Sequence, residues 1–179
     1  MSQPPSDLEA TTRLRRAPWV AWRDIVGAAG IGFLWLLAVG AVLLVGAKLD
    51  YPGLGAHADP VKVLTGIVMF GLATMRVPVG VSRLSIAVLP IGALVAFGWG
   101  LSSAARQAVA KLAAPGLRER VIAGARVAVP FAIMCWAAAL IFRFRGGTNP
   151  LGADAGWALV AGAIWGGLFG ALGGLRSRG

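Results

Sequence analysis

Apolar residues along this chain fall into long blocks, separated by short stretches that carry charge, glycine and proline. The blocks are residues 25–47, 63–75, 84–101, 121–142 and 156–175. Uninterrupted blocks are typical of helices surrounded by lipid, whereas the strands of a transmembrane barrel alternate apolar and polar residues. The pattern therefore predicts an all-α fold, a polytopic transmembrane helical bundle.

The first block, residues 25–47, contains no charge and would form about 34 Å of helix, enough to cross a hydrocarbon core near 30 Å. A cleaved signal peptide is the alternative, because Val45, Gly46 and Ala47 resemble a small-residue cleavage site. The apolar core of a signal peptide is only about 7 to 15 residues long, so an uncleaved helix is favoured.

The second block, residues 63–75, would reach only about 20 Å and is too short to span unaided. It predicts a re-entrant or interfacial helix, or a mismatched fifth span. The blocks 84–101, 121–142 and 156–175 predict further spans, the first two kinked at Pro90 and Pro130. Residues 102–120, with alanine-rich helical content and a break at Pro115-Gly116, predict an amphipathic interfacial loop.

Charge favours four spans with both termini in the cytoplasm, since cytoplasmic loops are enriched in Lys and Arg. Four spans place eleven basic residues inside and six outside, whereas five spans give eight and nine. The inside set for four spans is 13, 15, 16, 23, 106, 111, 118, 120, 126, 176 and 178. The predicted divisions are a cytoplasmic basic tail (1–24), a transmembrane domain (25–175) and a short cytoplasmic tail (176–179).

Composition agrees with a membrane protein and not with a soluble domain, because 58% of residues are hydrophobic and only 13% are charged. The net charge of +10 sits at the ends of the apolar blocks, where anionic lipid headgroups explain it, so nucleic acid is not an expected partner. Abundant Ala, Gly and Arg indicate a bacterial source, hence a bacterial cytoplasmic membrane. Cys135 is the single cysteine and is predicted to be a packed thiol.

Glycines recur every fourth position in the last block, at Gly162, Gly166, Gly170 and Gly174. Residues four apart share one face of a helix, and small residues let another backbone approach closely in lipid. Two milder stripes are Gly92-Ala96-Gly100 and Gly124-Ala128-Ala132. The favoured interpretation is packing between helices of one chain; the alternative is a homo-oligomer or a membrane partner subunit docked on this face.

Three arginines near apolar blocks, Arg76, Arg83 and Arg126, are the candidate substrate contacts. No Asp or Glu lies within a predicted span to pair with them, so contact with lipid headgroups is the favoured role. His57 with its neighbouring carboxylates lacks the spacing of a known metal site. The sequence therefore predicts no catalytic residue, no cofactor and no metal.

Residues 77–107, VPVGVSRLSIAVLPIGALVAFGWGLSSAARQ, resemble the streptophobe group of polytopic membrane proteins from high-GC Gram-positive bacteria. Members have a glycine-rich apolar segment, a polar turn and a "PLG"-like start to a span that ends in a basic cluster. Here the turn reads Leu89-Pro90-Ile91-Gly92, one residue away from that pattern, and the similarity covers residues 25–110. The resemblance implies a multi-pass membrane fold and no particular activity.

The sequence predicts an accessory or scaffold subunit without enzymatic activity, which packs through its glycine-rich C-terminal helix. The alternative is a small transporter or channel component that uses residues 63–83 and the proline-kinked helices.

Overall fold

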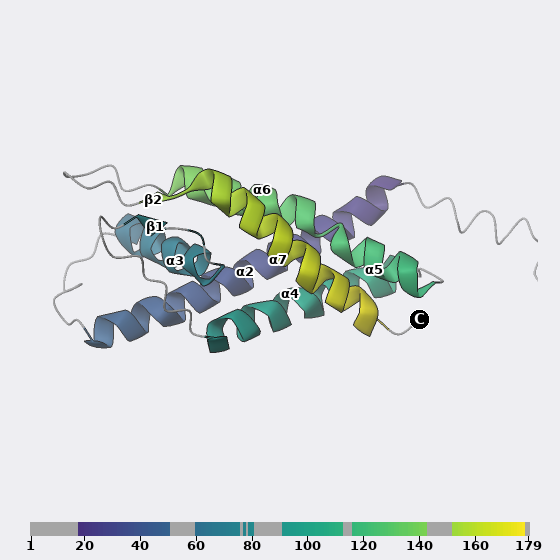
Figure 1. Ribbon diagram of the computed structural model, residues 1–179, viewed down its shortest axis with the longest axis horizontal. Helices are drawn as coiled ribbons and strands as arrows, with labels where there is room; N and C mark the ends of the chain where they lie inside the picture. The colour runs from purple at the N-terminus through teal and green to yellow at the C-terminus, as the bar shows by residue number, and fades with distance from the viewer. Residues whose placement is uncertain are drawn as a thin grey trace, which may run out of the picture.

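The computed structural model describes residues 18–50, 60–75, 77, 79–80, 91–112, 116–142 and 152–177, and these are helical apart from turns and one pair of two-residue strands (Figure 1). The elements are α2 (Pro18–Asp50), α3 (Pro60–Thr74), β1 (Val79–Gly80), α4 (Ile91–Leu112), α5 (Leu117–Ala125), α6 (Ala128–Ile141), β2 (Gly152–Ala153) and α7 (Ala155–Arg176). The prediction of a helical fold is confirmed.

Three stretches within the described residues are long and apolar enough to cross a membrane: Trp22–Gly46, Leu117–Ile141 and Ala155–Arg176. They lie where the sequence predicts three of its four spans. The first helix begins at Pro18, earlier than expected, because proline at the first helical position loses no hydrogen bond. Residues 18–24, at the end of the predicted tail, are thus helical and continuous with the rest of α2.

The helix α4 runs antiparallel to α2. Gly32 of α2 lies beneath Leu101, and Gly100 of α4 lies beneath Trp35. Toward the start of α2 the Lys111 ammonium is 3.6 Å from the carboxylate of Asp24. The two helices therefore face each other over most of the length of α4.

The predicted boundary of the third block is wrong, because α4 continues past Leu101 to Leu112. The helical content expected at 102–120 is present, but as part of longer elements and not as a separate loop: residues 102–112 continue α4, and α5 begins at Leu117, after the expected break. The alanine-rich run favours helix and buries Ala104, Ala105 and Ala108 on one face. Among the described residues α4 is not one of the long apolar helices; residues 84–90, with Pro90, lie outside the described residues.

A break at Arg126 and Val127 separates α5 from α6. Pro130 has no N–H to donate to the carbonyl of Arg126, and its ring crowds that carbonyl. The backbone tightens instead: the N–H of Val127 bonds to Gly124 O at 3.1 Å, and the N–H of Val129 bonds to Arg126 O at 3.4 Å. The expected proline kink in block 121–142 is therefore present.

The last helix, α7, runs antiparallel to α5 and α6 and parallel to α4. Gly170 faces Gly124 and Gly162 faces Ala132, whereas Phe169 covers Gly98 and Gly173 lies against Ser102. With α2 antiparallel to α4, the directions of α2, α4, the α5–α6 pair and α7 alternate along the chain. The start of α2 and the end of α7 consequently lie at one end of the molecule (Figure 1).

The short helix α3 has 15 residues, about 22 Å, and lies antiparallel on the second half of α2 (Figure 1). Gly66 packs against Leu44, and Gly71 packs against Leu36. At Gly40, a Cβ would collide with the carbonyl oxygen of Ile67, so the two backbones touch. The expected short helix in block 63–75 is present.

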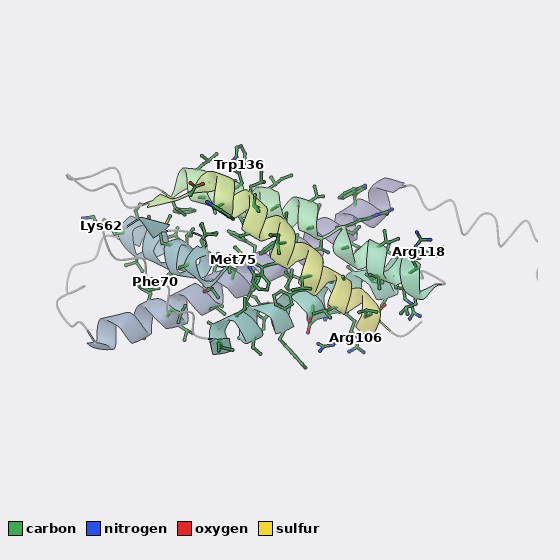
Figure 2. All side chains as sticks on the ribbon, viewed as in Figure 1. Lys62, Phe70, Met75, Arg106, Arg118 and Trp136 are labelled. Atoms are coloured by element: carbon green, nitrogen blue, oxygen red, sulfur yellow. The ribbon has the colours of Figure 1, made fainter. Side chains whose placement is uncertain are left out.

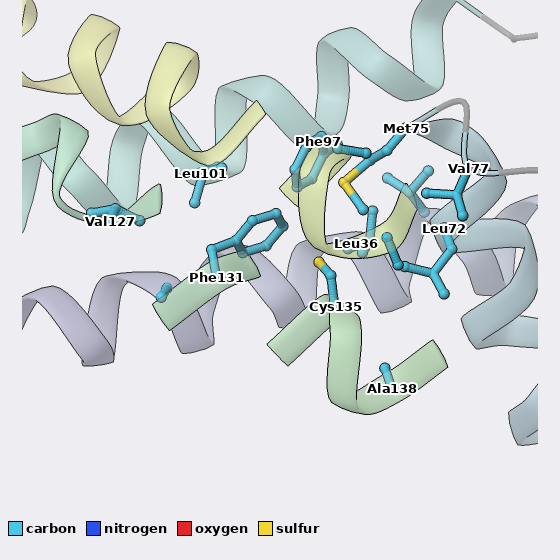
Figure 3. Close-up of a cluster of buried hydrophobic side chains, with 14 of the residues drawn as sticks. Leu36, Leu72, Met75, Val77, Phe97, Leu101, Val127, Phe131, Cys135 and Ala138 are labelled. Atoms are coloured by element: carbon cyan, nitrogen blue, oxygen red, sulfur yellow. The ribbon is translucent and has the colours of Figure 1, made fainter. Parts of the chain in front are cut away.

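The core lies between these helices and is apolar (Figure 3). Its largest fully buried side chains include Phe97, Phe131, Leu36, Leu72 and Leu101. The core thus draws large side chains from α2, α3, α4 and α6, and α7 adds Ala158 and Ala161.

Candidate functional site

The four predicted glycines of α7 are all buried and face α5 and α6. Gly162 is opposite Ala132, Gly166 opposite Ala128, Gly170 opposite Gly124 and Gly174 opposite Arg120. We call these eight positions the glycine interface. The register advances by four residues on both sides, so one milder stripe, Gly124-Ala128-Ala132, is the partner of the strong one.

The glycine interface depends on backbone contact. A Cβ at Gly166 would lie 3.0 Å from the Cα of Ala128, and one at Gly162 would lie 2.8 Å from the Cα of Ala132. The backbones of the facing helices are therefore close together. At this close approach, dispersion and weak Cα–H···O contacts stabilise helix association in lipid. In the structure this face is covered by α5 and α6 of the same chain, so another copy cannot occupy it without displacing them.

The other milder stripe is only partly covered. Gly100 lies beneath Trp35, whereas no atom of the other described helices lies within 4 Å of the place where a Cβ at Gly92 would be. Next to Gly92, an apolar groove of about 330 Å³ opens between α2 and α4. Its lining includes Trp35, Val39, Val42, Ala93 and Ala96.

Residues 60–75, 77 and 79–80 enter and leave at the same end of the molecule, and we call them the returning segment. α3 starts beside the end of α2 and ends near the middle of that helix. Val79 and Gly80 then pair with Ala153 and Gly152, directly before the start of α7 (Figure 1). The returning segment therefore reaches the centre of the molecule without crossing it.

At its inner end the returning segment meets a row of aromatic rings. The Trp165 indole Nε1–H donates to the carbonyl oxygen of Met75 at 3.3 Å. Trp165 stacks on Phe169, which meets Phe97 edge to face, and Phe97 stacks on Phe131, with centroids 5.5, 5.8 and 5.6 Å apart. Figure 3 shows Met75 pointing toward Phe97. We call this row of four rings the aromatic centre. It fills the interior of the molecule beside the inner end of α3.

Of the three predicted arginine contacts, the structure describes one. Arg126 is exposed at the break between α5 and α6 and has no ion-pair partner among the described side chains. Arg76 and Arg83 lie outside the described residues. The structure therefore does not test whether the three arginines lie close together.

Charge is divided between the two ends of the molecule. Figure 2 shows Lys62 at one end and Arg106 and Arg118 at the other. Six basic side chains within the described residues make up the second end, which we call the basic end: Arg23, Arg106, Lys111, Arg118, Arg120 and Arg176. The opposite end has Lys62 and Asp154 among its described side chains.

Two polar contacts at the ends of α7 were not predicted from the sequence. The Arg120 guanidinium donates to the carbonyl oxygen of Ser177, and its buried Nε has no hydrogen-bond partner among the residues that the structure describes. Asp154 caps α7 by accepting from the N–H of Trp157 at 2.9 Å. An Asp directly before an apolar helix is a recognisable cap signal. The Arg120 contact joins residues 57 apart in sequence, and no local pattern indicates it.

Candidate ligands for a metal do not gather in the described part of the chain, where no three His, Cys, Asp or Glu residues come together. Cys135 is buried in α6 beside Gly162. The structure does not describe the side chains of His57, Asp50 and Asp59.

Comparison with known proteins gives no relative: no family model matches the chain, and no match was found among the curated proteins or among the solved structures. The resemblance of residues 77–107 to the streptophobe group therefore remains a prediction from those residues.

Proposed function

We propose that the chain is an integral protein of a bacterial cytoplasmic membrane with four spans, formed by α2, α4, the α5–α6 pair and α7. Both termini are cytoplasmic, and the returning segment is re-entrant from the outer side. Three observations support this: three long apolar helices, alternating helix directions, and the gathering of basic side chains at one end. In this arrangement Arg126 reaches along the α5–α6 surface toward lipid headgroups.

Single cysteines test this topology, in a Cys135→Ala background whose folding is checked first. Cysteines replacing Lys62 and Asp154 should react with a membrane-impermeant maleimide in intact cells. Cysteines replacing Arg23 and Arg176 should react only after the membrane is opened. A fifth span through α3 would put Arg23 and Arg176 on opposite sides, which contradicts the proposal.

Within the membrane we propose that the protein acts as an accessory or scaffold subunit with no enzymatic activity of its own. The observation that carries this is the apolar packing around α7: the aromatic centre and the glycine interface fill the space between α7 and its neighbours with apolar groups. A rigid apolar core suits a subunit that holds a fixed shape. Partners would then contact its outer faces, because the glycine interface is already occupied.

Native mass spectrometry after extraction in mild detergent tests the scaffold role. A partner subunit at fixed stoichiometry is the expected result, and a chain that is always alone contradicts the proposal. The variants Gly166→Ile and Gly170→Ile should prevent folding and not merely dissociate an oligomer. Folded monomers of these variants, released from a native oligomer, would favour an intermolecular glycine face.

A transporter or channel component is the second candidate, since α3 ends at the centre of the molecule as broken helices of transporters do. Cysteine replacements along α3, at Thr65, Val68 and Leu72, distinguish the two. Protection of all three from aqueous reagents agrees with a scaffold, because these side chains are buried. Labelling that continues inward from the outer side would favour a permeation path and would replace the scaffold proposal.

A further inference from the structure

One exposed face of α4 combines aromatic, basic and small residues. Gly92, Trp99 and Arg106 are spaced seven residues apart and therefore lie within about 40° of one another around the helix. Trp99 is 64% exposed, and Arg106 is exposed as well. The face thus offers a large ring and a cation to whatever surrounds the protein.

The end of α7 brings a second guanidinium to this face. Arg176 lies over the Trp99 ring, with its Cζ 5.6 Å from the ring centroid, a cation–π arrangement that holds the side chain in place. One turn earlier, Gly173 touches the backbone of α4 at Ser102 and Arg106. Arg106 points outward beside the last turns of α7 (Figure 2). We call Trp99, Arg106 and Arg176 the basic patch.

The basic patch carries positive charge without an acidic partner in the part of the chain that the structure describes. The described carboxylates are those of Asp24, Glu119 and Asp154. Asp24 pairs with Lys111, Glu119 is on α5, and Asp154 is at the opposite end of the molecule. Two guanidiniums on one exposed surface, with no described carboxylate paired to either, favour an anionic ligand, and guanidinium geometry suits phosphate.

An apolar path leads from the basic patch along α4. The groove between α2 and α4 has a volume of about 330 Å³ and includes Ala96 and Gly92 in its lining. Ala96 is ten residues from Arg106, a rise of about 15 Å along the helix. One leaflet contributes about half of a hydrocarbon core near 30 Å, so an acyl chain anchored at Arg106 reaches the groove.

We propose that the basic patch and the groove together bind one anionic phospholipid of the cytoplasmic leaflet. Its phosphate lies between Arg106 and Arg176, and one acyl chain runs past Trp99 to the groove at Ala96 and Gly92. The assignment to that leaflet rests on the proposed topology; the binding itself rests only on the contacts above.

Titration of the protein in neutral detergent with phosphatidylglycerol, followed by native mass spectrometry, tests the proposal. Replacing Arg106 and Arg176 by Gln together should weaken binding by about tenfold or more, since each contributes a charge-assisted hydrogen bond. The matched control replaces Arg23 and Arg118, two other basic-end residues, and should change binding less than about twofold. Equal affinity in the two double variants would overturn the proposal.

A second arm separates a lipid from a free phosphate. Gly92→Leu adds a side chain to open space in the groove and should weaken the binding of phosphatidylglycerol. Its circular dichroism spectrum should stay unchanged, which shows that the variant still folds. Glycerol phosphate should bind far more weakly than the lipid; equal binding would leave only a phosphate site. Loss of a co-purifying acidic protein, with lipid binding unchanged, would assign the patch to a partner instead. Lipid binding measured in detergent does not depend on the topology of the protein in the membrane. This test therefore fails or succeeds independently of the labelling experiment.

Discussion

Gly124 and Gly170 face each other so closely that neither has room for a side chain. A Cβ on Gly170 would collide with the carbonyl oxygen of Gly124, and a Cβ on Gly124 would collide with the carbonyl oxygen of Gly170. The contact is therefore reciprocal between α5 and α7. It sits just before the break at Arg126, where α5 gives way to α6, and so fixes both halves of that pair against α7.

Gly170→Ala should destabilise the protein because the added methyl group meets backbone atoms that cannot rotate away. We expect a loss of about 1–3 kcal/mol, the usual cost of overpacking, measured by steric trapping or by titration with denaturing detergent. The control is Gly167→Ala on the same helix, where the new Cβ would meet only Ala128 Cβ at 3.7 Å. This control should change stability by less than about 0.5 kcal/mol. Equal effects of the two variants would mean that the glycine interface is not tightly packed.

Trp165→Phe should loosen the inner end of the returning segment, because phenylalanine keeps a ring beside Phe169 but cannot donate to Met75 O. We expect a loss of about 0.5–1.5 kcal/mol and faster hydrogen exchange at residues 72–77. Trp157→Phe is the matched control, since Trp157 is 56% exposed at the start of α7. Unchanged exchange at residues 72–77 in the Trp165 variant would show that the hydrogen bond does not hold this segment.

Sequence patterns located the helices and the glycine face because both depend on local spacing. Gly124-Ala128-Ala132 and Gly92-Ala96-Gly100 look equivalent in the sequence, yet the first is covered by α7 and the second partly lines a groove. That difference depends on which helices become neighbours. Local spacing does not contain this information.

Other features depended on contacts between distant residues. The inner end of α3 is held by a hydrogen bond between Met75 and Trp165, which are 90 residues apart.

The extension of α4 to Leu112 was missed because Arg106 and Lys111 suggested an interfacial loop. Both cations project outward from a helix whose other face is buried, so charge alone did not mark its end.

Asp154→Ala should weaken the start of α7 by removing the side-chain acceptor for the Trp157 N–H. A lost N-cap costs about 1 kcal/mol, and the first turn of α7 should show increased hydrogen exchange. Asp154→Ser is the control, because serine restores a capping oxygen without the charge. If the Ser and Ala variants are equally destabilised, capping is not the role of Asp154.

Arg120→Met should release the end of α7, because Arg120 is the side chain that donates to the carbonyl of Ser177. A hydrogen bond from a charged donor stabilises by about 1.5–3 kcal/mol, and methionine keeps most of the apolar stem while removing the donor. Hydrogen exchange at residues 173–177 and protease cleavage after Arg176 should both increase. Arg118→Met, two residues away on an exposed part of α5, should leave both unchanged. Since Gly174 lies against the Arg120 backbone, a folded Arg120→Met variant with a protected C-terminal turn would show that backbone packing alone holds this end.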